Sequence, residues 1–180
     1  MHGYFQPVKI QAPQGAWISL AEEGSFAAGQ AGEVLVGMHI SAVYRLRVSG
    51  FAPEHEREVY PTVEIIDRLY PPAGLALRYP IPIELTEEEL NLAADGSFVT
   101  RIIYLEEPST ALPVRQYEEQ PWVEAPHGVD PLVMADEMGR PVAILRIGGR
   151  LPQRNNGAGV PCDPPFIYYD PAACNVTDVQ

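Results

Sequence analysis

The sequence predicts a mostly β protein: a β-sandwich of the immunoglobulin-like or transthyretin-like kind, with about nine or ten short strands. Three observations support this. Segments rich in β-branched and aromatic residues recur at close spacing, turn-forming residues separate them, and 19 prolines are spread along the 180 residues. Proline is excluded from central strands and helix interiors, so its abundance indicates many rigid connections between short elements.

Strands are predicted along most of the chain before residue 86. Pro7 and Pro13 flank the first of them, which we therefore expect at a sheet edge. Two stretches rich in small residues, proline or glycine, residues 25–32 and 70–79, are expected to be loops. The predicted strands are residues 8–11, 17–20, 33–36, 43–48, 59–66 and 81–85.

The stretch VYRLRV, residues 43–48, shows alternation with a period of two. Its arginines are the predicted outward residues. Val43, Leu46 and Val48 are the predicted inward residues. The alternation slips at Tyr44–Leu46, which leaves the facing of Tyr44 open.

One short helix is the clearest local prediction, at about residues 87–95. Thr86 is a suitable N-cap, and Glu89 follows three residues later, which makes a capping box. Leu85 and Leu90 occupy the positions of a hydrophobic staple. We expect this helix to connect two strands rather than to form a layer of its own.

The second half of the chain predicts fewer and weaker strands, apart from FVTRIIYL at residues 98–105. Residues 132–135 and 142–147 flank the sequence DEMGRP and predict a hairpin with Gly139 in its turn. The weaker predicted strands are residues 114–117, 122–124, 132–135 and 142–147.

The chain divides into three parts. Residues 1–14 form an N-terminal segment with the expected edge strand, and residues 15–150 form the sandwich. Residues 151–180 contain five prolines and little apolar periodicity. They predict an irregular C-terminal tail.

Charge and hydropathy exclude several partners. The formal net charge is −12, so neither nucleic acid nor an anionic membrane surface is an expected partner. No apolar run is long enough to span a membrane. Residues 1–10 have no basic n-region and no apolar h-region, so the chain either stays inside the cell or is the mature form of an exported protein.

No pattern for catalysis or for metal binding occurs. The four histidines stand apart from one another and from the cysteines, at spacings that no zinc motif uses. There is no G-x-S-x-G, no glycine-rich phosphate loop and no EF-hand loop. We therefore expect a protein that is not an enzyme and holds no cofactor.

The two cysteines, Cys162 and Cys174, lie close together in the tail. A disulfide between them would close a loop of ~13 residues and stabilise the protein by about 3 kcal/mol. Two free thiols are the alternative. Asn175 begins an N-x-T sequon, which makes it a candidate glycosylation site in an exported protein.

Five stretches of the chain, in their order, carry a family resemblance. They are PVKIQAPQGAWISLA, VYRLRVSG, YPTVEIIDRLYPP, PIPIELTEEELNLAADGSFVTRIIYLEEP and DPLVMADEMGRPVAILRIGG. They resemble exported envelope proteins of planctomycete-type bacteria, over residues 6–149. The resemblance implies an extracellular or cell-envelope location, often with a lipid-bearing cysteine near the start, although here no cysteine precedes Cys162. It implies no activity, and no functional residue is carried over.

These observations favour a non-enzymatic structural protein of the cell exterior that assembles with copies of itself through its terminal segments, as a filament or envelope layer. Exposed sheet edges would accept a strand from a neighbour. The alternative is a module that binds a carbohydrate or cell-wall ligand of unknown identity through Trp17, Trp122, Tyr168 and Tyr169. The expected assembly contacts are Tyr4, Phe5, Phe166, Ile167, Tyr168 and Tyr169.

Overall fold

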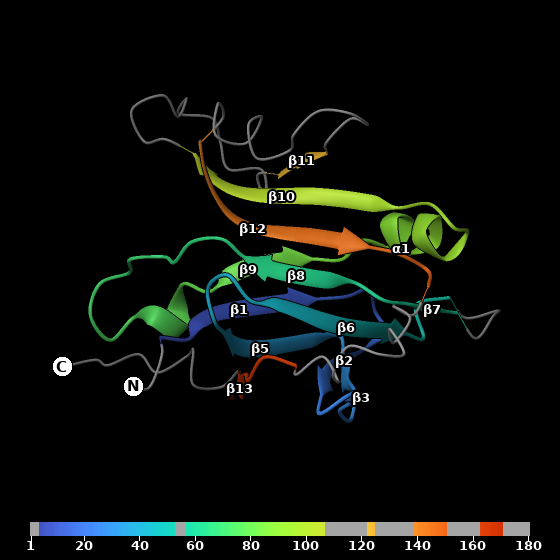
Figure 1. Ribbon diagram of the computed structural model, residues 1–180, viewed down its shortest axis with the longest axis horizontal. Coiled ribbons are helices and arrows are strands. Elements are labelled where there is room, and N and C mark those ends of the chain that lie inside the picture. The colour runs from blue at the N-terminus through green and yellow to red at the C-terminus, as the bar shows by residue number, and fades with distance from the viewer. Residues whose placement is uncertain (1–3, 53–56, 107–121, 125–138, 151–162, 171–180) are drawn as a thin grey trace, which may run out of the picture.

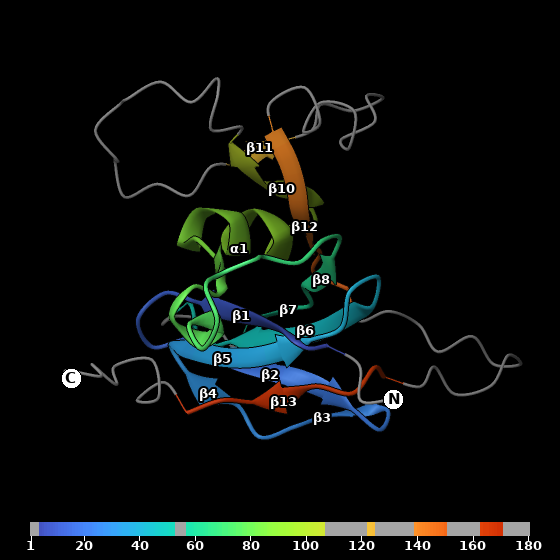
Figure 2. The same ribbon diagram turned by 90° about the vertical axis from the view of Figure 1, so that its left-hand side faces the viewer.

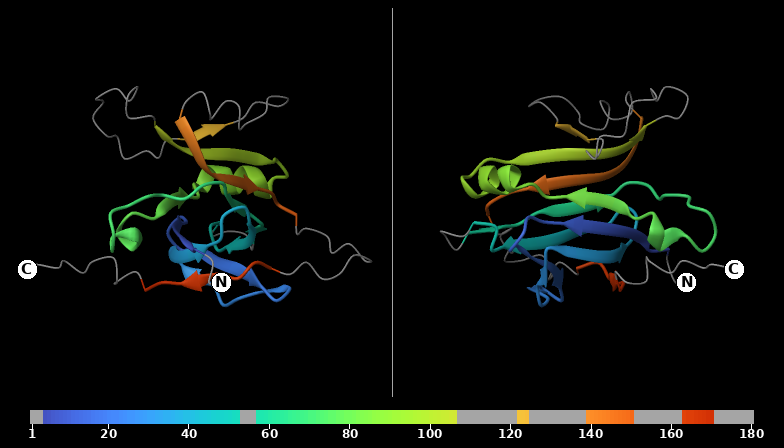
Figure 3. Two further views of the ribbon diagram at one scale, coloured as in Figure 1. Left: turned by 60° about the vertical axis from the view of Figure 1, so that its left-hand side comes forward. Right: turned by 180° about the vertical axis from the view of Figure 1, so that it is seen from behind.

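The computed structural model describes residues 4–52, 57–106, 122–124, 139–150 and 163–170. These residues form thirteen strands, one α-helix and one short 3-10 helix, so the mostly β prediction is confirmed. The strands belong to two sheets that lie one behind the other in Figure 1. The view from behind, in the right panel of Figure 3, brings β1 and β9 to the front.

The first sheet has four strands in the order β13-β5-β1-β9. Strand β1 pairs antiparallel with β5 and parallel with β9, so the predicted edge position of this strand is wrong. Pro7 is tolerated inside β1 because the pairing with β9 begins only at Val8. The bounds are β1 Gln6–Gln11, β5 Glu33–Met38, β9 Ile81–Glu84 and β13 Ile167–Tyr168.

The second sheet follows the order β11-β10-β12-β8-β6-β2-β3, with β4 beside β2 and β7 beside β6. All of these strand pairings are antiparallel. The bounds are β2 Trp17–Glu22, β3 Ser25–Phe26, β4 Gln30–Ala31, β6 Val43–Ser49, β7 Glu58–Val59, β8 Thr62–Ile65, β10 Val99–Glu106, β11 Trp122–Glu124 and β12 Gly139–Ile147.

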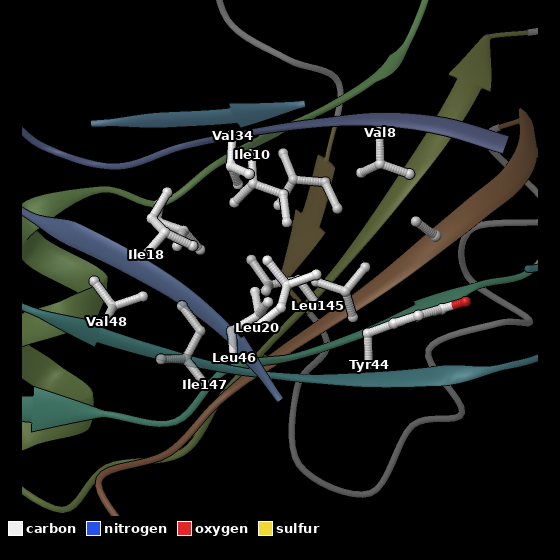
Figure 4. Packing of buried hydrophobic residues seen from close by; sticks show 14 of the residues in the cluster. Val8, Ile10, Ile18, Leu20, Val34, Tyr44, Leu46, Val48, Leu145 and Ile147 are labelled. Atoms are coloured by element: carbon white, nitrogen blue, oxygen red, sulfur yellow. The ribbon is translucent and has the colours of Figure 1, made fainter. Parts of the chain in front are cut away.

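One hydrophobic cluster joins the inner faces of the two sheets. Val8, Ile10 and Val34 come from the first sheet and are fully buried against residues of the second, such as Leu46 and Leu145. Figure 4 shows these side chains meeting between the strands. Burial of apolar surface, at about 25 cal/mol per Å², is what holds the two layers together.

Strand β6 faces the core differently from the prediction. Tyr44, Leu46 and Val48 are buried, whereas Val43 is 45% exposed. The regular alternation therefore runs through the tyrosine, and the prediction that Val43 points inward is wrong. Figure 4 shows Tyr44 at the margin of the cluster with its hydroxyl directed away from it. An aromatic ring can be buried in this way when its polar end reaches a hydrogen-bond partner.

Gly139 does not form a turn. It is the first residue of β12 and pairs with Glu106 of β10. A Cβ atom placed on it would collide with the carbonyl of Leu105, so glycine is needed here for a close approach of two strands. The predicted strands at residues 114–117 and 132–135 lie outside the described residues.

The two predicted loops contain short regular elements. Residues 25–32 include β3 and β4, and the loop at residues 70–79 includes the 3-10 helix Ala76–Arg78. Each of these elements is only two or three residues long, which is below the length that a sequence pattern reveals.

The predicted helix is confirmed as α1, Glu87–Ala94, beside β10 and β12 (Figure 1). Thr86 closes the capping box, since its Oγ accepts from the Glu89 amide at 3.3 Å and the Glu89 carboxylate accepts from the Thr86 amide at 3.1 Å. Leu90 and Ala93 face the core. The buried Arg101 of β10 lies 3.2 Å from the Glu89 carboxylate and donates to the carbonyl of Glu84.

Glu89 therefore serves both the helix cap and a buried cation. Burial lowers the pKa of Arg101, and the carboxylates of Glu89 and Glu84 oppose that shift. The guanidinium stays charged at neutral pH because its ordinary pKa is so high. Removing the carboxylate would take this ion pair away from a buried charge.

We expect Thr86→Ala to lower the free energy of unfolding by about 1 kcal/mol, because it removes only the cap. Glu89→Ala should cost about 3–5 kcal/mol, since it also removes an ion pair of the buried Arg101. Thr86→Ser keeps the cap and should match the wild type. Denaturant unfolding measures all three, and equal costs for Thr86→Ala and Glu89→Ala would contradict the double role of Glu89.

Candidate functional site

The expected assembly contacts come together around one strand, β5. Two of them precede β1 at the start of the chain, and four lie near its end. We call residues 163–170 the strap. It runs along the outer edge of β5 at the lower side of the molecule in Figures 1 and 2. The six residues are Tyr4, Phe5, Phe166, Ile167, Tyr168 and Tyr169.

The strap completes the first sheet. Its strand β13 pairs antiparallel with β5, Ile167 opposite Gly37 and Tyr168 opposite Val36. The Tyr169 amide then donates to the carbonyl of Leu35 at 2.9 Å. The edge of β5 that faces away from β1 is thus paired by a segment that the sequence predicted to be an irregular tail.

Asp163 anchors the start of the strap to the second sheet. Its Oδ1 accepts from Nε and Nη2 of Arg45 at 3.1 and 2.5 Å. Its Oδ2 accepts from the amide of Gly24 at 2.9 Å. The Asp163 side chain is 4% exposed, and that of Arg45 is 25% exposed. A carboxylate this buried needs charge-assisted hydrogen bonds, and Arg45 supplies two from one side.

The Gly24 amide belongs to the turn between β2 and β3. Glu23 and Gly24 both have positive φ, 49° and 81°, as in a type I′ hairpin turn. This turn presents a backbone N–H to the strap. Asp163 therefore links the tip of one hairpin to the outer face of β6.

Tyr44 forms the second anchor. Its hydroxyl accepts from the His39 amide at 2.8 Å and donates to the carbonyl of Pro165 at 2.8 Å. Burial raises the pKa of this phenol, and the hydrogen bond from His39 opposes the shift. The hydroxyl therefore keeps the proton that it donates to the strap at neutral pH.

The N-terminal residues lie against the same end of β5. The rings of Phe5 and His39 are 4.0 Å apart between centroids, and His39 Nδ1 lies 3.2 Å from the carbonyl oxygen of Tyr4. A Cβ atom at Gly37 would come within 2.8 Å of the Tyr169 hydroxyl and 2.9 Å of Phe5 Cβ. Both terminal segments thus meet above a glycine that leaves room for them.

The strap has a buried side and an open side. Phe166 packs against the main core, whereas Ile167 and Tyr168 are 42% and 39% exposed. Tyr4 is exposed to a similar extent, 41%. The site therefore presents an apolar surface to solvent beside a strand that is held mainly by polar anchors.

Several predicted features fall outside this site. Cys162, Cys174 and Asn175 lie outside the described residues, as does the side chain of Trp122. Within the described ranges, no three His, Cys, Asp or Glu side chains form a group that could hold a metal ion. In the same part of the chain, no helix is long and apolar enough to cross a membrane.

The sequence did not identify the residues that receive the strap. Tyr44 and Arg45 appeared only as members of an alternating strand, and Gly37 carried no signal. Asp163 was one acid in an irregular segment. The proline pair that follows it was the one available hint, because prolines favour an extended backbone that can add to a sheet edge.

Comparison of the chain with models of protein families, with curated proteins and with solved structures finds no match. The function of the strap must therefore be argued from its own contacts.

We expect Asp163→Asn to release the strap without unfolding the sandwich. Hydrogen bonds to a charged group contribute about 1.5–3 kcal/mol, so the Tyr169 amide should exchange with solvent roughly 10- to 150-fold faster. The Ile10 amide in β1 should be unaffected. Native-state hydrogen exchange measures both.

The matched control is Asp95→Asn. Asp95 pairs with Arg57 at 2.9 Å, but its side chain is 65% exposed, so its loss should change stability by less than about 1 kcal/mol. Unchanged exchange at Tyr169 in the Asp163→Asn variant would show that the Asp163–Arg45 pair does not hold the strap.

Proposed function

We propose that this chain is a non-enzymatic structural protein of the cell exterior that assembles with copies of itself through its terminal segments. The observation that carries the proposal is the strap, a short C-terminal strand that closes an open sheet edge. Addition of a strand to a sheet edge is a common way for proteins to bind extended peptides. The same geometry serves equally when the strand belongs to a neighbour.

The contacts of the strap suit a detachable element. Its ladder with β5 covers two residue pairs, and the Tyr169 amide adds one hydrogen bond to Leu35. The remaining attachment depends on Asp163, Tyr44 and the packing of Phe166. An element with few contacts opens at a lower free energy than the core strands do. The sandwich keeps its own core when the strap leaves, apart from the partly buried Phe166.

The exposed side chains of this site could become buried in the assembled state. Tyr4, Ile167 and Tyr168 are each about 40% exposed and lie around the same strand edge. Tyrosines are enriched among the residues that dominate binding at protein interfaces. The location outside the cell rests on the sequence resemblance alone.

The test is light scattering on the full chain over a wide range of concentrations, followed by electron microscopy of any assembled material. We expect the mass to rise with concentration for the wild type and for Asp95→Asn. Asp163→Asn, which loosens the strap, should stay monomeric. A wild type that remains a strict monomer at the highest concentration would overturn the proposal.

A second candidate function, binding of a carbohydrate, is supported by the position of Trp17. This residue is 50% exposed, so it is not a core residue. Its indole is bordered by two glycines: a Cβ atom at Gly29 would lie 3.6 Å from Cε3, and one at Gly50 would lie 3.4 Å from Cδ1. An open indole can stack on an apolar sugar face.

Polar groups lie beside this indole on the outer face of the second sheet. Trp17 is opposite Ser49, and Ser49 is opposite Glu58, which pairs with Arg47 at 3.8 Å. An aromatic surface with a few polar groups is the usual composition of a small-ligand site. Soluble glycans should quench the tryptophan fluorescence of the wild type. The quenching should be lost in Trp17→Ala and kept in Tyr79→Ala, which changes another exposed aromatic residue. No quenching would exclude it for the glycans used.

A further inference from the structure

We propose that the groove which holds the strap accepts the strap of a second copy, so that neighbouring molecules exchange residues 163–170. This inference rests on the proposed assembly function and names the partner and the contacts. The groove consists of the edge of β5, the Tyr44 hydroxyl, the Arg45 guanidinium and the Gly24 amide. It is already complementary to one peptide, the sequence DPPFIYYD.

Charge fixes one end of the peptide in the groove. Asp163 is nearly completely buried and meets a guanidinium and a backbone N–H, both of which are donors. An unrelated peptide without a carboxylate at this position would leave Arg45 without its partner. The site therefore selects an acidic residue at the start of an incoming strand.

Spacing fixes the rest of the register. The carbonyl of Pro165, two residues after Asp163, accepts from Tyr44, and the partly buried Phe166 packs against the core next. Tyr169 then passes over Gly37, where any side chain would collide with it. The strap carries, in this order and at these intervals, an acid, a carbonyl that can accept from Tyr44 and two aromatic residues. A second copy of the chain supplies the same sequence and is therefore the natural occupant.

The connection to the strap is long enough for exchange. Residues 151–162 link Arg150 to Asp163, and twelve residues reach at most ~40 Å when extended. That distance is comparable to the diameter of a small domain, ~30 Å. The sandwich ends with β12, which precedes this link. A strap can therefore be donated to an adjacent molecule without disturbing β12.

Mass action sets which groove the strap occupies. Its contacts are the same in its own groove and in that of a neighbour, so the balance depends on concentration. A short tether gives its own strap an effective concentration of order mM. We expect the strap to stay in its own molecule in dilute solution and to exchange where copies are packed at comparable density, as in an envelope layer.

Two charge-reversal variants test the exchange directly. Arg45→Glu puts an acid in the groove opposite Asp163, and Asp163→Arg puts a base on the strap opposite Arg45. In either variant alone, strap and groove repel each other both within and between molecules. In an equimolar mixture, each strap matches only the groove of the other variant. The protein concentration should be near the effective concentration that the tether gives the strap, ~mM. The mixture should then show about a twofold rise in mass by light scattering, while each variant alone stays monomeric.

The double variant, Arg45→Glu with Asp163→Arg, is the control. Its strap and groove match within one molecule, so protection of the Tyr169 amide should return. A mixture that remains monomeric while the double variant regains this protection would overturn the exchange.

The wild type at the same concentration separates this inference from the assembly function. If it associates while the mixture does not, assembly stands and occurs through other contacts, and strap exchange is wrong. If the wild type stays monomeric while the mixture pairs, the groove accepts a foreign strap but the assembly function fails.

A milder variant covers the case in which the charge reversals prevent folding. Arg45→Lys retains the charge, and a carbodiimide can join the new amine to the Asp163 carboxylate. A mixture of light and heavy isotope-labelled protein of this variant, treated at ~mM concentration, should give cross-linked peptides with one light and one heavy half. Cross-linked peptides with two halves of the same label only would show that every strap stays in its own molecule, and would overturn the proposal.

Discussion

The described fold depends on one constraint, which is that both edges of β5 need hydrogen-bond partners. One edge is paired with β1 over six residue pairs. The other edge has β13 and the Tyr169 amide. Residues Val34 to Met38 are all buried, so an unpaired edge here would place polar backbone groups beside the hydrophobic cluster. The strap meets this need, and it therefore belongs to the fold as well as to the proposed assembly site.

Two buried ion pairs mark the places where elements join this framework. Arg101 and Glu89 join α1 to β10, while Asp163 and Arg45 join the strap to β6. In each pair one member is nearly completely buried, and that member also has a hydrogen bond to a backbone group. Such pairs add little net stability compared with apolar residues, but they are costly to break. We infer that they determine where the helix and the strap dock, while the apolar cluster supplies most of the stability.

The parts of the fold that local interactions determine could be predicted from the sequence. Helix α1 follows from Thr86, Glu89 and Leu90, which lie within one turn and a half of one another. The central position of β1 could not be predicted, because its second neighbour β9 arrives more than 60 residues later and pairs parallel to it. The hydroxyl of the buried Tyr44 finds its acceptor at Pro165, which is 121 residues away. For the same reason the groove stayed hidden, since its members become a site only after the chain returns to β5.

The strap and the core differ in how their stability is distributed, and this difference is what links the fold to assembly. The core strands share one cluster, so none of them can leave without exposing the others. The strap contributes Phe166 to that cluster and otherwise depends on a few directed polar contacts. Directed contacts are specific and short in range, so they are fully remade when the same peptide enters the same groove from another molecule. The strap thus covers an edge that is costly to leave unpaired, binds in one register and has few ties to the core. These are the physical requirements of a strand that copies of a protein can exchange.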